Sequence, residues 1–387
     1  MIGAARLTPV ARASGPREAL ARGADLAAVA DFASLDELRR AAPEWAALCA
    51  RAIEPNPFAE PGFLLPLIAY ERPARLVFVL ARRGEKLIGF VALRRPRLGL
   101  GRVWMSPYAA LPACAFDRDE AGQALAAVTA LLVRRTRLTG IVWPFIERGG
   151  AFEAALRACA QAQRLPLEVA GARRRAALKL SGAAQFDAGL NPKRATKWSR
   201  KARKLSGKLE AVPGPAAIEA FFEVERRGWK GELRTALADD PARLGFARAA
   251  LEAFAREGRL DAMTLRLDGA PIAAGLVLTA GSRAFYWKTA YDEAFAEASP
   301  GIQLTLAHSR RLAEAPGLRL ADSCALEDHP MIGRVWGDAL AFEDWALGLR
   351  PGAERALALW LALAKAAARA SEQTKAWVKR ALGRKRT

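Results

Sequence analysis

The chain has few of the residues that build metal sites, disulfide frameworks and membrane spans. Its 387 residues include four cysteines and two histidines. The cysteines lie far apart in the sequence, so their spacing fits neither a zinc site nor a disulfide framework, and it favours a reducing compartment. No apolar run reaches the roughly 18 residues that a transmembrane helix needs, and residues 1–24 have no apolar segment typical of a signal peptide. We therefore expect a cytoplasmic protein without a metal.

Acidic residues are scarce relative to basic ones. Sixty lysines and arginines face 40 carboxylates, which gives a formal net charge of +20. Such an excess favours anionic partners, among them coenzyme phosphates, acidic glycans, membrane lipids and nucleic acid. Hydrophobic residues make up 52% of the chain and charged residues 26%, which is typical of a globular protein long enough for two domains with full cores.

The first half alternates strand and helix signals. Ser34, followed three residues later by Glu37, forms the capping box that begins a helix. Gly84 lies between two apolar runs and indicates a β-hairpin. We predict strands over 26–32, 74–82, 86–95, 103–108 and 140–145, and helices over 34–52, 60–70, 120–135 and 150–163.

The second half repeats this order of elements. Asp268-Gly269 between two apolar runs again predicts a hairpin turn. The fold class is therefore mixed α/β, with two domains of one fold, each a mixed sheet flanked by helices. We predict helices over 191–205, 216–228, 242–257 and 299–312, and strands over 263–267, 271–279, 283–291 and 318–322. The expected domains are a flexible leader (1–24), an N-terminal domain (25–168), a C-terminal domain (169–350) and a basic amphipathic helix (351–387).

The helix predicted over 299–312 follows an aromatic strand and begins with Ser299-Pro300-Gly301. Serine at the N-cap and proline in the first turn are typical of a helix start. We expect unpaired backbone N–H groups over 301–304, where the helix dipole favours an anion such as a phosphate. An ordinary helix start without a ligand is the alternative.

Six segments carry a resemblance to a known superfamily. They are N-P-K-R-A-T-K-W-S-R-K-A-R-K-L (191–205), G-W-K-G-E-L-R-T-A-L (228–237), L-R-L-D-G-A-P-I-A-A-G (265–275), F-Y-W-K-T-A-Y-D, S-P-G-I-Q-L and D-S-C-A-L-E-D-H-P-M-I. In this order over 190–337, they resemble the GNAT-type acyltransferases, in the CelD-like branch related to FemABX-like transferases. Residues 56–64 carry a looser resemblance in the first half.

This resemblance implies a tandem GNAT fold and an N-acyltransferase. The donor would be acetyl-CoA or another acyl-CoA, and the acceptor an amine or hydroxyl of a sugar or of a cell-envelope or exopolysaccharide precursor. The chain departs from the family's coenzyme loop in having Glu297 before the helix start, where a carboxylate would oppose a pyrophosphate. The implied coenzyme-binding residues are Ser299, Gly301, Ile302, Gln303 and Leu304.

Proton transfer and acceptor binding have their own candidates. Asp322, His329 and Asp292 are expected to be catalytic, because a histidine's pKa suits proton transfer near neutral pH; a purely structural role is the alternative. A Cys324–His329 nucleophilic pair is a further alternative. Tyr286 and Lys288 lie two apart on the predicted strand, so we expect them to share a face. The predicted substrate-binding residues are Tyr286, Lys288, Tyr291, Trp229, Lys230, Arg194 and Lys197.

Several alternatives stay open at this point. The donor could be an aminoacyl-tRNA, as in FemABX-like proteins, or the chain could be a non-catalytic accessory protein of polysaccharide synthesis. The basic run 193–208 could bind phosphates or simply be solvated. The helix 354–382 could lie on an anionic membrane at the inner face, or dock on the domain. No DNA partner is expected.

Overall fold

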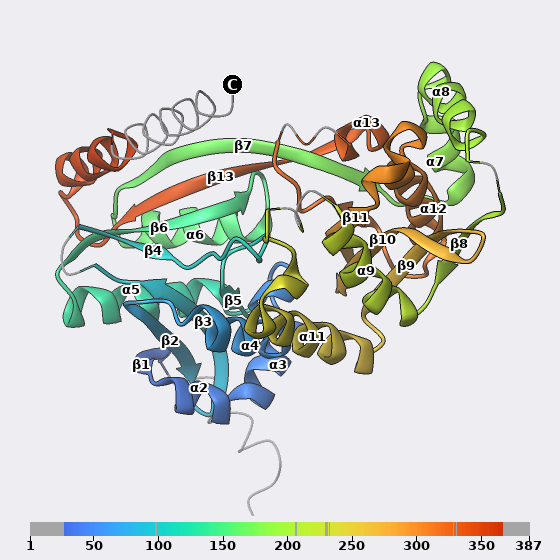
Figure 1. The fold of residues 1–387 in the computed structure, drawn as a ribbon. Helices are drawn as coiled ribbons and strands as arrows, with labels where there is room; N and C mark the ends of the chain where they lie inside the picture. Colours follow the sequence, from blue (N-terminus) through green and yellow to red (C-terminus); the bar gives the residue numbers. More distant parts are fainter. Residues whose placement is uncertain are drawn as a thin grey trace, which may run out of the picture.

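The computed structural model describes residues 27–96, 99–205, 207–228, 231, 233–327, 329 and 331–366. Its strands form one 13-stranded sheet, with the order β1-β2-β3-β4-β6-β13-β7-β12-β11-β10-β9-β8 and β5 paired to β3. Two pairs, β4–β6 and β11–β12, are parallel, so the sheet is mixed. Helices cover it in two halves that are joined by two long strands (Figure 1). The predicted mixed α/β fold class is confirmed.

The first half contains the elements before residue 163. Its strands are β1 (Val29–Ala33), β2 (Leu76–Arg83), β3 (Lys86–Arg94), β4 (Gly99–Val103), β5 (Cys114–Phe116) and β6 (Leu138–Glu147). Its helices are α2 (Leu35–Arg40), α3 (Ala42–Ala50), η1 (Pro57–Ala59), α4 (Pro61–Glu71), α5 (Ala121–Arg135) and α6 (Ala151–Ala162).

The second half contains the remaining elements. Its strands are β7 (Leu167–Lys179), β8 (Leu209–Pro213), β9 (Leu260–Leu267), β10 (Ala270–Ala280), β11 (Arg283–Tyr291), β12 (Leu320–Asp322) and β13 (Asp338–Gly348). Its helices are α7 (Ala183–Gly189), α8 (Pro192–Ala202), α9 (Ala216–Arg227), η2 (Leu237–Asp239), α11 (Pro241–Arg256), η3 (Glu293–Ala298), α12 (Pro300–Glu314) and α13 (Ile332–Val335). A last helix covers 354–366.

Most predicted elements are present, and two predictions are wrong. The capping box forms, since the Ser34 side chain accepts from the Glu37 N–H at 3.2 Å and the Glu37 carboxylate accepts from the Ser34 N–H at 2.7 Å. The helix that it begins is not continuous to residue 52, because it ends at Ala41 and restarts with Pro43 in the first turn of α3. The strand predicted over 103–108 lies earlier, at β4, which ends at Val103; the Trp104 N–H makes one more bond, to the Ala92 carbonyl of β3.

Four strands were missed by the sequence reasoning: β5, β7, β8 and β13. Two of them, β7 and β13, join the halves. β13 lies between β6 and β7 and pairs with both of them over most of its length. β7 carries three consecutive arginines, Arg173 to Arg175, so it lacks the alternation that indicates a strand. The predicted boundary between residues 168 and 169 falls inside β7.

A shared aromatic core also connects the halves. Phe58 and Phe63 come from the first half, and Phe285 and Trp287 come from β11. The ring centroids of Phe58 and Phe285 lie 5.8 Å apart, and those of Phe63 and Trp287 lie 5.5 Å apart, both edge to face. Aromatic pairs of this geometry add to the stabilisation from burial. The position of β11 relative to the first half is therefore fixed by packing.

Candidate functional site

The two parallel strands β11 and β12 diverge in the second half. They pair only over Arg283–Phe285 and Leu320–Asp322. Along its other edge, β11 pairs with β10 as far as Tyr291. Among the described strands, the edge of β11 that faces β12 therefore has no partner from Tyr286 onward. An edge of this kind presents backbone N–H and C=O groups that an extended ligand can pair with.

A β-bulge in β11 decides which side chains face the first half. Lys288 lies opposite Leu276 and Tyr286 lies opposite Val277, so Trp287 is the extra residue. As a result, Trp287 and Lys288 both face the first half, where the Lys288 ammonium lies 5.5 Å from the centre of the Tyr108 ring. The prediction that Tyr286 and Lys288 share a face is wrong, because a bulge interrupts the alternation of the strand.

Tyr286 instead packs into the core on the α12 side. It is 3% exposed, and its ring contacts those of His308 and Trp336 with centroids 5.3 and 5.7 Å apart. Burial raises the pKa of the Tyr286 phenol. This position favours a packing role for Tyr286 over the predicted contact with substrate.

Four polar residues from different elements meet beside the bulge, and we call them the interface cluster: Tyr70, Tyr108, Arg243 and Lys288. The two tyrosine hydroxyls lie 3.5 Å apart. Burial, reinforced by the neighbouring Tyr108, raises the pKa of Tyr70 to about 12. Although burial opposes its charge, a hydrogen bond with Tyr108 helps to raise the pKa of Arg243. At neutral pH the cluster thus presents a protonated Tyr70 phenol beside cationic groups.

A buried ion pair joins β7 to β12. The side chains of Arg175 and Asp322 are 3% and 1% exposed and bonded to each other. Arg175 Nη1 also donates to the Ala110 carbonyl at 2.9 Å, and the Asp322 carboxylate accepts from the Cys324 N–H at 2.9 Å. Asp322 therefore fixes the loop after β12. Its geometry favours that structural role over the predicted role in proton transfer.

The loop after β12 contains two further candidates. Cys324 has a left-handed backbone, with φ of 54°, and burial together with the Asp322 charge raises the pKa of its thiol well above the usual value. His329 Nδ1 lies 3.4 Å from the Met331 N–H and 3.5 Å from the Ile332 N–H, at the start of α13. Because Nδ1 is the acceptor, a neutral His329 carries its proton on Nε2. Burial therefore disfavours the Cys324 thiolate that a nucleophilic role would need.

His329 lines a groove of about 480 Å³. Arginines from β7 form one wall of the groove, and the loop after β12 forms the other. Phe145, near the C-terminal end of β6, also has a left-handed backbone, with φ of 53°. The lining residues are Phe145, Arg173, Arg174, Arg175, Ala325, Leu326, Glu327 and His329.

The start of α12 differs from the predicted anion cradle. The N–H groups of Ile302 and Gln303 both donate to the Ser299 carbonyl, at 3.0 and 3.2 Å, so they are not unpaired. Gly301 is packed, because a Cβ there would lie 2.7 Å from the Met331 sulfur. Leu304 is fully buried in the core.

A cationic side chain nevertheless lies at this helix start. The Lys201 ammonium donates to the Ser299 hydroxyl at 2.8 Å. Lys204 lies 3.2 Å from the carboxylate of Glu297, so the acidic residue in the expected coenzyme loop has a cation beside it. Both members of that second pair are exposed, and the pair adds little stability.

The remaining predicted residues are spread over the second half. Asp292 caps η3 by accepting from the Ala294 N–H at 3.0 Å. Tyr291 packs against Gly301, and Arg194 donates to the Arg334 carbonyl at 3.2 Å. Lys197 is exposed on α8. Trp229 and Lys230 lie outside the described residues.

Sequence reasoning missed Tyr70, Tyr108, Arg243 and Arg175. They come from four separate segments, and no motif connects them. One weak signal was present, because the whole chain has only four tyrosines and two of them meet here. Within the described part of the chain, no group of three histidine, cysteine or acidic residues could hold a metal ion. No helix of those residues is both long and apolar enough to cross a bilayer.

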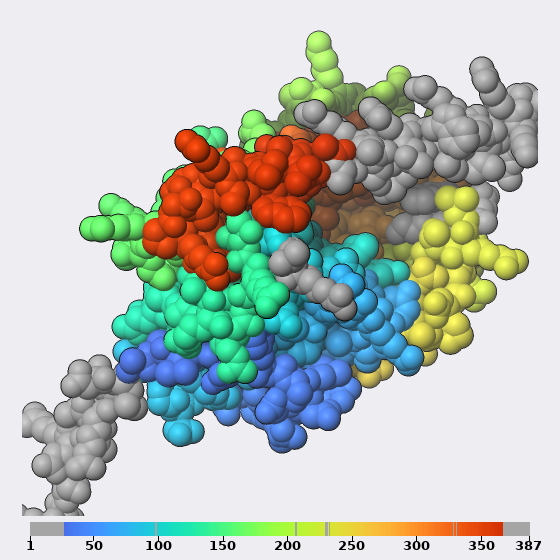
Figure 2. Space-filling view, turned by 90° about the vertical axis from the view of Figure 1, so that its left-hand side faces the viewer, coloured from blue at the N-terminus to red at the C-terminus, as the bar shows by residue number. Residues whose placement is uncertain are grey.

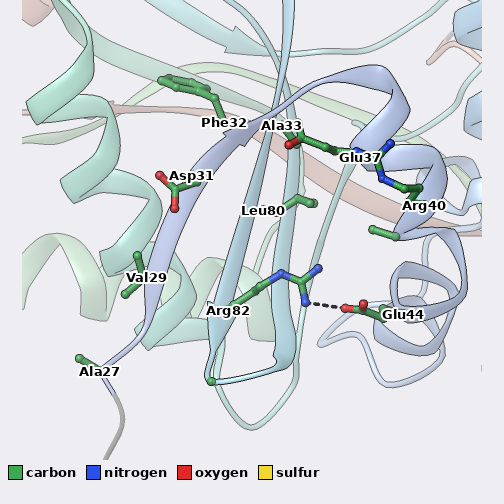
Figure 3. A pocket seen from close by; sticks show the side chains of 12 residues that line it. Ala27, Val29, Asp31, Phe32, Ala33, Glu37, Arg40, Glu44, Leu80 and Arg82 are labelled. Atoms are coloured by element: carbon green, nitrogen blue, oxygen red, sulfur yellow. Dashed lines mark hydrogen bonds and ion pairs between the residues drawn. The ribbon is translucent and has the colours of Figure 1, made fainter.

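A second hollow, of about 670 Å³, lies far from this cluster, between β1 and the helices α2 and α3 (Figure 3). Its prominent polar contact is an exposed ion pair, in which Arg82 lies 2.5 Å from Glu44. None of the predicted site residues lines it. We therefore place the candidate site at the β11–β12 divergence.

Comparison with known proteins identifies the second half. Residues 192–329 match the family described as "Acetyltransferase (GNAT) domain", so this segment is a GNAT-type acyltransferase domain. The matched segment contains β11, α12 and the loop after β12 as far as His329. No curated protein matches the chain in sequence.

Solved structures resemble the fold of most of the chain. FemX is 12% identical, with a TM-score of 0.50, over 82% of this chain and 96% of that one. The C-terminal domain of an Agrobacterium fabrum protein described as a lysylphosphatidylglycerol synthetase is 13% identical, with a TM-score of 0.51, over 84% and 96%. A tandem GNAT protein from the clavulanic acid biosynthesis pathway is 18% identical, with a TM-score of 0.41, over 84% and 99%.

Proposed function

We propose that this chain transfers an acyl group, acetyl in the first instance, from acyl-CoA to an amine or hydroxyl of a sugar or cell-envelope precursor. The divergence of β11 from β12, inside the segment that matches the acetyltransferase domain, is the observation that carries the proposal. Acyl transfer from a thioester needs the acyl donor to be held in line with the acceptor. It also needs an N–H group that hydrogen-bonds to the reacting carbonyl oxygen. An open strand edge beside a polar cluster can meet both needs.

The donor would lie along β11. The coenzyme's extended arm carries amide groups that can pair with the strand edge beyond Phe285, as an added strand does. A backbone N–H of the bulge at Trp287 would then polarise the thioester carbonyl. The phosphates would approach the start of α12, where the helix dipole and the Lys201 ammonium both favour negative charge.

The acceptor would lie on the side of β11 that faces the first half, against the interface cluster. Lys288 and Arg243 supply positive charge for charge-assisted hydrogen bonds, and the Tyr70 and Tyr108 hydroxyls lie beside them. The Tyr70 phenol stays protonated at neutral pH, because its pKa is raised to about 12, so it can donate a hydrogen bond to the acceptor. In this proposal Asp322 and Asp292 hold the structure, and His329 donates from Nε2.

Calorimetric titration with acetyl-CoA tests the donor half of the proposal. Lys201→Met should weaken binding about tenfold, because one charge-assisted contact to a phosphate is worth about 1.4 kcal/mol or more. Lys208→Met is the matched control, since Lys208 pairs with Glu210 at 2.6 Å and is outside the proposed cradle. Absence of acetyl-CoA binding by the unaltered protein would refute the coenzyme assignment.

A second candidate is an aminoacyl-tRNA-dependent transferase. Two observations favour it: the exposed lysines and arginines of α8, and a fold similar to that of FemX. Filter binding with charged tRNA separates the two candidates, because tRNA binding without acetyl-CoA binding would support the second one. Binding of neither, with no transfer activity, would instead favour a non-catalytic accessory role.

A further inference from the structure

Five arginines line one hollow on the surface of the first half. They come from the start of β2, the end of β3 and the end of α5, and they surround a volume of about 890 Å³. Eight described residues line the hollow, and none of them is acidic. The dipole of α5 favours the two arginines in its last turn, but it gives no reason for the other three. The arginines are Arg75, Arg95, Arg134, Arg135 and Arg137.

The helix over 354–366 has an apolar side that the described residues leave uncovered. Its inner leucines, Leu357 and Leu361, are buried against Val142 and Ala346. Leu359 and Leu363, two residues further along in each case, point the opposite way and are 59% and 50% exposed. Most surface helices present a polar outer face. This outer face instead consists largely of leucine and alanine.

A tryptophan packs the helix against β4, which lies close to the arginine hollow. The Trp360 ring packs on Gly99, where a Cβ would lie 3.0 Å from the ring. Gly99 pairs with Leu138, which directly follows Arg137. Figure 2 shows the helix in red beside the green segment around residue 140, on one face of the molecule. We call this surface the docking face; it comprises the five arginines with Leu359, Trp360 and Leu363.

We propose that the docking face binds the surface of an anionic lipid bilayer. The arginine guanidinium groups match lipid phosphates in charge and geometry. The exposed leucines can enter the boundary between headgroups and acyl chains, and tryptophan is favoured at that depth. An apolar strip beside a dense cationic hollow complements such a membrane in both respects. The inference does not depend on the acyltransferase proposal, because the docking face lies outside the interface cluster.

Cosedimentation of the full chain with vesicles tests the proposal. The protein should sediment with vesicles of phosphatidylglycerol and phosphatidylcholine, and should remain in solution with phosphatidylcholine alone. Each arginine near an anionic surface contributes about fivefold to partitioning. The variant Arg134→Gln/Arg135→Gln/Arg137→Gln should therefore bind about a hundredfold more weakly, and Leu359→Asn/Leu363→Asn should also bind more weakly.

A matched control separates the effect of the docking face on vesicle binding from the effect of net charge. Arg40→Gln/Arg203→Gln/Arg256→Gln removes the same charge from exposed positions elsewhere and should bind as the unaltered protein does. Equal losses in the control, or no binding of the unaltered protein to anionic vesicles, would overturn the proposal. A dimer in sedimentation analysis that Leu359→Asn/Leu363→Asn dissociates would also overturn it, because the face would then join two copies. All the altered positions are exposed, and melting temperatures check that each variant folds.

Discussion

The buried pair of Arg175 and Asp322 provides a sharp test of the site, because Asp322 was expected to be catalytic. Replacing one partner leaves the other charge buried without compensation, which costs about 3–5 kcal/mol. The two side chains are 3% and 1% exposed, so solvent cannot replace the lost partner. We expect Arg175→Met and Asp322→Leu each to lower the free energy of unfolding by about this amount.

The double variant Arg175→Met/Asp322→Leu should recover most of that loss. Exchange of a buried pair for apolar side chains of similar volume is often close to neutral. A cost of about 1–2 kcal/mol should remain, because the Cys324 N–H loses its acceptor. Urea denaturation of the four proteins gives the coupling energy.

The same four proteins separate the two roles of Asp322. If Asp322 is structural, acyl transfer recovers with stability in the double variant. A stable but inactive double variant would restore Asp322 as a catalytic residue. A double variant as unstable as the single ones would contradict the reasoning about buried charge.

Three further predictions follow from individual contacts. Gly140→Ala should lower the free energy of unfolding by about 1–3 kcal/mol in urea denaturation, because its Cβ would lie 2.7 Å from a β13 carbonyl. Gly122→Ala is the control, because Gly122 has open space around it, and it should not lower the free energy of unfolding. Burial alone would raise the pKa of Asp261, but a hydrogen bond from His308 and a nearby arginine hold it below its usual value. The stability that this carboxylate contributes is present above its usual pKa of about 3.9 and is lost as the pH falls through its lower pKa in the folded protein. Asp261→Asn should remove this acid-dependent loss of stability, which melting temperatures measured over a range of pH would show. Lys288→Met should reduce acyl transfer at least about tenfold with an unchanged melting temperature, and unaltered turnover would exclude this lysine from the acceptor site.

The sequence alone determined the features that depend on neighbouring residues. Asp268 and Gly269 have the positive φ angles of 48° and 83° that their hairpin requires, and the capping box of Ser34 and Glu37 forms as expected. Caps and tight turns involve groups only a few residues apart, so their chemistry can be seen in the sequence. The resemblance over 190–337 likewise located the acetyltransferase domain, which matches over 192–329.

Only the tertiary structure decided how the candidate site is assembled. β13 crosses from the end of the chain to pair with β6, and no local periodicity indicates a pairing over that separation. The bulge at Trp287 turns Lys288 toward Tyr108, a reversal that depends on the register with β10. Asp322 has a carboxylate that a catalytic residue could use, but its buried partner Arg175 lies 147 positions away in sequence. Chain segments that are remote in sequence meet only when their apolar surfaces pack together, so the interface cluster is a property of the folded core and not of any motif.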